Sequence, residues 1–94
     1  MPAADDIPFR IAASLALDLI RERPILDDKT AADVAWHALR SGAPATFHEM
    51  QYAGEVVRMM QEILAGRATR IEPPEPARQR ALEQLKASEH PPRR

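Results

Sequence analysis

The chain has 94 residues, 45% of them hydrophobic, and contains no cysteine. This length allows one domain at most, and the lack of cysteine excludes disulfides, thiolate nucleophiles and the Cys-based zinc and iron–sulfur sites. Alanine supplies 17 of the 42 hydrophobic residues, which leaves 25 large apolar side chains for a core. We therefore expect a small margin of stability, which a partner or a second copy of the chain would increase.

The formal net charge of −1 hides an asymmetry along the chain. Residues 1–66 hold 6 Lys/Arg and 10 Asp/Glu, a net charge of −4, whereas residues 67–94 hold 7 and 4, a net charge of +3. The simpler explanation is that the basic part serves solubility or lies on its own acidic body, and the alternative is that it contacts an acidic partner or nucleic acid.

Neither the N-terminus nor the most apolar run indicates export or membrane insertion. The N-terminus carries Asp5 and Asp6 where a signal peptide carries positive charge. The most apolar run, residues 11–20, is about half as long as a membrane span and contains Asp18. We expect a soluble, cytoplasmic protein that does not contact a membrane.

The nine prolines leave four uninterrupted stretches, each of which predicts a helix, because proline cannot donate a backbone hydrogen bond and disfavours helix in the residue before it. The first helix is expected over residues 7–22. Asp6 is its expected cap and Pro24 follows its end. Its apolar residues cover a wide arc, so this helix should lie at the centre of the packing.

The second helix is expected over residues 29–41. It should start near Asp28 or Thr30, because Thr30 and Asp33 have the spacing of a weak capping box. Ser41 and Gly42 should end it. Its inner face is expected to consist of Val34, Ala35, Ala38 and Leu39, with Trp36 at an edge.

The third helix, expected over residues 46–65, has the clearest boundaries. Residues 46–49 have the form of a capping box, and Gly66 supplies a stop. Gly54 costs about 1 kcal/mol relative to alanine inside a helix, so we expect a tight crossing by another helix there. An apolar stripe recurs at steps of three and four along one face, and consists of Phe47, Met50, Ala53, Val57, Met60 and Leu64.

Residues 67–76 should form an extended linker stiffened by proline, with residues 69–71 as the one place for a short extended pairing. Residues 77–88 predict a fourth helix that forms mainly if it docks, because its apolar edge is thin. The expected fold class is all-α. A three-helix bundle over residues 1–66 is followed, over residues 67–94, by a Pro-rich linker, a conditional short helix and a basic disordered tail.

No arrangement of residues predicts catalysis or a cofactor. A Gly-x-Ser-x-Gly elbow and a Gly-rich phosphate loop are both absent. His48-Glu49 resembles the start of the zincin motif, but the second histidine is missing. A metal or hydrolytic site around His48 and Glu49, with His37 and Glu55 as further ligands, stays a third alternative.

The second and third helices, joined by Ser-Gly-Ala-Pro, resemble a helix-turn-helix superficially. The exposed face of the third helix would offer three carboxylates against Arg58 alone, which is unfavourable for phosphates. Nucleic-acid binding is therefore disfavoured. The alternative function that stays open is that of a small DNA-binding regulator or antitoxin-like protein. Such a protein would dimerise through the bundle and use the basic tail to hold DNA or a toxin.

The function we favour is a small non-catalytic protein–protein interaction or adaptor module that binds a partner or itself, as a homodimer. It would use the apolar face of the third helix and residues 67–94 as a docking arm. Methionine is frequent on partner-binding surfaces, although ordinary core is the simpler explanation of the stripe. Trp36 is the expected edge hot spot. The expected partner-binding residues are Trp36, Phe47, Met50, Ala53, Gly54, Val57, Met60 and Leu64.

Overall fold

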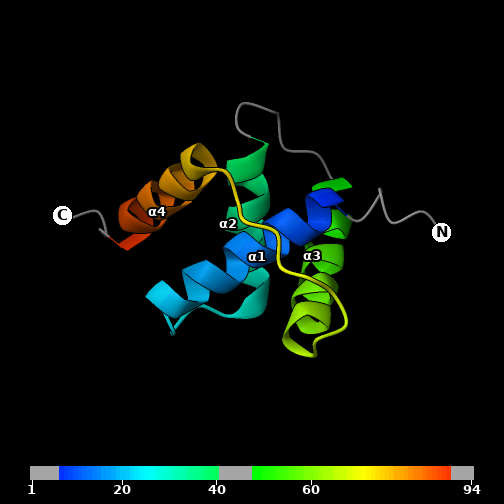
Figure 1. Cartoon of the computed structure of the whole chain (residues 1–94). Coiled ribbons are helices and arrows are strands. Elements are labelled where there is room, and N and C mark those ends of the chain that lie inside the picture. Colours follow the sequence, from blue (N-terminus) through cyan, green and yellow to red (C-terminus); the bar gives the residue numbers. More distant parts are fainter. Residues whose placement is uncertain (1–6, 41–47, 90–94) are drawn as a thin grey trace.

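The computed structural model describes residues 7–40 and 48–89, and the side chains of 48–53 and 87–89 lie outside this description. Over these ranges the chain is all-α (Figure 1), as predicted. The helices are α1 (Ile7–Glu22), α2 (Asp28–Leu39), α3 (His48–Leu64) and α4 (Glu75–Glu89). Each helix end lies within two residues of its predicted position. None of these helices has the length and apolar character needed to cross a membrane.

Helix α1 lies at the centre of the packing, as its wide apolar arc predicts. It packs against both α2 and α3, while α4 packs mainly on α2. In Figure 1, α3 and α4 lie on opposite sides of the α1–α2 pair, and their described residues do not contact each other. The segment that joins α3 to α4 (yellow in Figure 1) crosses α1. The C-terminal part of the chain therefore returns to the first helix.

The core is built largely from small side chains, as the composition predicts. Of the 17 buried hydrophobic residues in the described part, nine are alanine. Alanine lets helices approach closely, but each such contact buries little area. The largest fully buried apolar side chains are Leu15, Leu19, Val56 and Met60. Helix α4 contributes Ala77, Ala81 and Leu85 to the same cluster, so described residues on both sides of Gly66 share one core.

The apolar stripe of α3 faces the core at some positions and solvent at another. Met60 is 1% exposed and lies in the core beside Val56 and Met59, and Val57 packs partly buried against it. Leu64, by contrast, is 73% exposed. Phe47 and the side chains of Met50 and Ala53 lie outside the described residues. Among the described stripe residues, Leu64 is thus the most accessible to a partner.

The predicted tight helix crossing at Gly54 is wrong within the described part of the chain. Gly54 is exposed, and a Cβ at this position would meet no atom within 4 Å. No neighbouring backbone therefore requires glycine here, and the cost of glycine in this helix has no compensating contact among the described residues.

The helix ends are set by capping residues, and one of them differs from the prediction. Helix α2 is capped by Asp27, whose carboxylate accepts a hydrogen bond of 3.3 Å from the backbone N–H of Thr30. The predicted capping box at Thr30 is therefore wrong, because Thr30 lies inside the helix. Gly66, with φ of +83°, ends α3 as predicted. The other expected ends, at Asp6, residues 41–42 and residues 46–49, fall wholly or partly outside the described residues.

Helix α4 begins two residues earlier than predicted because proline is compatible with a helix start. Pro76 occupies the first turn, where a missing backbone N–H leaves no hydrogen bond unmade. Glu75 precedes it and places a carboxylate at the positive end of the helix dipole. The sequence pattern predicts Pro76 as the last residue of the linker instead.

Candidate functional site

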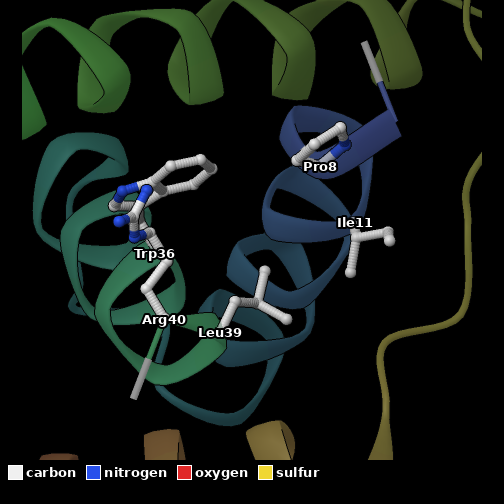
Figure 2. A pocket seen from close by; sticks show the side chains of 5 residues that line it. All are labelled: Pro8, Ile11, Trp36, Leu39 and Arg40. Atoms are coloured by element: carbon white, nitrogen blue, oxygen red, sulfur yellow. The ribbon is translucent and has the colours of Figure 1, made fainter. Parts of the chain in front are cut away.

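An apolar pocket opens between the first turn of α1 and the last turn of α2 (Figure 2). Its volume is about 280 Å³, and it is lined by Pro8, Ile11, Trp36, Leu39 and Arg40. Pro8 and Arg40 are exposed, whereas Ile11 and Leu39 are partly buried. Small-molecule sites typically occupy roughly 300–1,000 Å³. The pocket lies near the lower end of that range and has room for a single side chain.

Helical periodicity brings the pocket residues together. Pro8 and Ile11 are three residues apart on α1, and Trp36, Leu39 and Arg40 are spaced by three and four on α2, so each set shares one face. Pro8 is compatible with the first turn of α1. Arg40 is the C-cap of α2 and donates its backbone N–H to the carbonyl of Trp36 at 3.0 Å.

Trp36 forms the inner wall of this pocket. Its ring stacks on Phe9 of α1 with a centroid separation of 5.3 Å and an interplanar angle of 17°. The guanidinium carbon of Arg40 lies 5.7 Å from the Trp36 ring centroid, within cation–π distance. Trp36 is only 5% exposed, so its expected position at the edge of α2 is wrong. Figure 2 shows Arg40 beside Trp36, with Pro8 and Ile11 on the opposite wall.

A polar contact joins α1 to the C-terminal segment. The carboxylate of Asp18 accepts two hydrogen bonds of 2.9 Å from Arg70 and one of 3.1 Å from Arg78. Glu72 bonds both arginines, at 3.1 and 3.2 Å. The hydrogen bond with Asp18 is the main cause that raises the pKa of Arg70 above its ordinary value. This cluster holds residues 70–78 against α1, and a nearby polar pocket of about 330 Å³ has wall residues of both charge signs.

Ser14 completes this contact. Its side chain is fully buried, and its hydroxyl donates to the carbonyl of Arg10 at 2.8 Å while accepting the backbone N–H of Ile71 at 3.0 Å. Of residues 69–71, where we expected a short extended pairing, Arg70 and Ile71 are therefore hydrogen-bonded to side chains of α1. Neither Ser14 nor Asp18 is among the residues that the sequence singles out for a role. Their one signal was two polar residues four apart on an apolar face of α1.

Arg80 of α4 binds the end of α2. Its Nε and Nη2 donate to the carbonyl of Ala38 at 2.9 and 2.7 Å, which satisfies one of the last carbonyls of the helix. Arg67 likewise pairs with Glu62. Seven basic residues follow Gly66, and in the described part of the chain four of them contact acceptors within the chain, namely Arg67, Arg70, Arg78 and Arg80. For these four, the explanation in which the basic segment lies on its own body is confirmed.

The metal alternative would need His48 and Glu49 close to His37 and Glu55. Among the described side chains, no three of His, Cys, Asp or Glu lie close enough together to hold a metal ion. The side chains of His48 and Glu49 fall outside that description.

Comparisons of this chain with known protein families, with curated proteins and with solved structures found no match. Function is therefore inferred from the geometry of the residues alone. Of the predicted partner-binding residues, the pocket contains Trp36, and the remaining described ones belong to α3.

Proposed function

We propose that this chain is a small non-catalytic protein–protein interaction module whose α1–α2 pocket receives one apolar side chain of another protein chain. The observation that carries the proposal is an apolar pocket of side-chain size, with Pro8 and Ile11 on one wall and Trp36 and Leu39 on the other. Side chains that fill such pockets supply most of the binding energy at protein interfaces. The nearly complete burial of Trp36 fixes one wall before binding, which lowers the entropic cost.

In this proposal the C-terminal segment stabilises the pocket from within the chain. Helices α1 and α2 supply the pocket, and the conditional fourth helix supports it through Arg80, which binds Ala38 next to the pocket residues Leu39 and Arg40. The docking arm expected from the sequence thus acts within the chain, by holding the last turn of α2 in place.

The test uses displayed random peptides selected against the full chain. Enriched peptides are titrated with fluorescence as the readout, because Trp36 is the only tryptophan and lines the pocket. Ile11→Lys should weaken binding at least tenfold, since it places a charge in an apolar pocket. Leu64→Lys is the matched control, because Leu64 is exposed and lies on α3. It should leave binding unchanged.

Two outcomes would contradict the proposal. If Leu64→Lys abolished peptide binding while Ile11→Lys left it intact, the α3 face and not the pocket would bind the peptide. Failure to enrich any peptide on the folded chain would argue against an interaction module of this kind. Circular dichroism of both variants shows whether each one is folded.

A further inference from the structure

We propose that the occupant of the pocket is Ile25 of a second copy of this chain, with Asp28 of that copy paired to Arg40. This inference rests on the proposed function and names its partner. It is carried by two surfaces of the same molecule that match in apolar character and are opposite in charge, the α1–α2 pocket and the α1–α2 loop.

The loop supplies an exposed apolar side chain. Ile25 is 92% exposed, the most exposed large hydrophobic residue in the described part of the chain. The next residue, Leu26, packs against the core and anchors the loop. Ile25 is therefore held outward on a fixed loop, and its size suits a pocket of about 280 Å³.

The loop also supplies a carboxylate close to that side chain. Asp27 and Asp28 are both exposed. The carboxylate of Asp27 caps α2 through Thr30, whereas Asp28 makes no ion pair or hydrogen bond with another described side chain. Asp28 is three residues from Ile25, so an apolar group and a carboxylate project from one short segment.

The pocket mouth supplies the complementary charge. Arg40 is exposed and held over the Trp36 ring, and no described carboxylate is paired with it. A guanidinium stacked on an aromatic ring keeps its N–H groups available for a carboxylate. Arg80, also without a described carboxylate partner, adds a second positive charge at Ala38. Residues 41–47, which follow α2, contain no charged side chain.

A two-fold axis makes both contacts at once. The loop joins the end of α1 to the start of α2, whereas the pocket is formed by the start of α1 and the end of α2. Because loop and pocket belong to opposite ends of the same helix pair, a two-fold axis across the pair can bring each loop to the other's pocket. The dimer is closed and leaves neither pocket empty.

The experiment measures molar mass by light scattering on the full chain, over a concentration series that extends into the millimolar range because the interface is small. The wild-type chain should form a dimer as concentration rises. Ile25→Lys and Ile11→Lys should each keep it monomeric, and Leu64→Lys should leave the dimer unchanged. Ile25 is almost fully exposed, so this substitution should not affect folding.

A charge swap tests the pairing itself. Arg40→Glu faces Asp28 with a like charge and should raise the dimer dissociation constant more than tenfold. Combining Arg40→Glu with Asp28→Arg should return the constant to within about threefold of wild type, since each pair is again of opposite charge.

Several results would overturn this inference. They are a wild-type monomer at all concentrations, a dimer indifferent to Ile25→Lys, a charge swap without rescue, and a mass that grows beyond two chains. A monomer whose pocket still binds peptides in an Ile11-dependent way would leave the proposed function intact and refute only the second copy as its partner. A monomer that binds no peptide would refute both.

Discussion

Two of the contacts that helix α1 makes are opposite in character, the one with the C-terminal segment and the one with the end of α2. At the first contact, Ser14 and Asp18 are buried and bonded to Arg70, Ile71 and Arg78. At the second, Pro8 and Ile11 form a pocket that stays partly open to solvent. Polar groups are buried where the chain itself supplies their partners, and at the pocket the described residues leave apolar surface accessible. We expect the first contact to govern stability and the second to govern association.

The largest effect should follow from removing both cations of the polar contact. Arg70→Ala combined with Arg78→Ala leaves Asp18, 8% exposed, without a described cationic partner. We expect a loss of about 2–3 kcal/mol in the free energy of unfolding, below the value for a fully buried pair because both arginines are partly exposed. Urea denaturation measures it. Arg21→Ala, an exposed arginine on the same helix, is the control and should change little.

A smaller loss should follow from Ser14→Ala. The backbone N–H of Ile71 would lose its hydroxyl acceptor, which costs about 1–2 kcal/mol when the donor is left unsatisfied. Amide hydrogen exchange at Ile71 should accelerate as well. Thr69→Ala, an exposed neighbour, should leave stability unchanged. Unaltered exchange at Ile71 would mean that this hydrogen bond does not hold the segment.

At the pocket, Ile11→Lys should lower stability by less than about 1 kcal/mol, because Ile11 is partly exposed and a lysine stem can cover apolar surface while its ammonium reaches water. The same substitution should abolish association. A destabilisation larger than that of Ser14→Ala would show instead that the pocket belongs to the core, and the comparison between the two contacts would be wrong.

The smallest effect should come from an ion pair on the surface. The hydrogen bond from Arg67, at 2.9 Å, is the main cause that lowers the pKa of Glu62 below its unfolded value of 4.5. A lowered folded-state pKa contributes stability above pH 4.5, and this contribution is lost as the pH falls through the folded value. Glu62→Gln should therefore melt slightly below wild type at neutral pH, and the difference should vanish in acid. If the difference in melting temperature persisted in acid, its cause would be packing and not the ion pair.

The sequence predicts the helices well because their signals are local. Proline positions and apolar spacing locate each helix within two residues of its observed bounds. Which face of each helix is buried is harder to predict from the sequence, because it depends on the helices packed against it. Met60 and Leu64 belong to one stripe, yet one is buried and the other exposed. Trp36 was expected at an edge and is buried because Phe9, from another helix, stacks on it.

The docking of the C-terminal segment was the least predictable feature of the fold. Arg70 and Asp18 are 52 residues apart, and no local pattern links them. The charge asymmetry between the two parts of the chain was the available signal, and it allowed binding to the chain's own body or to another molecule. The pocket could not be predicted without knowing how α1 and α2 pack, although one of its residues, Trp36, was singled out from the sequence.

The pairing of Asp18 also sets an order of events during synthesis. Its two arginines follow 52 and 60 residues later. At about 5–20 residues per second, the ribosome adds Arg70 roughly 3–10 s after Asp18. Until then the carboxylate has neither cation, so burying this face of α1 carries the same cost as in the Arg70→Ala, Arg78→Ala double variant. The first helix to be made is therefore among the last to complete its packing.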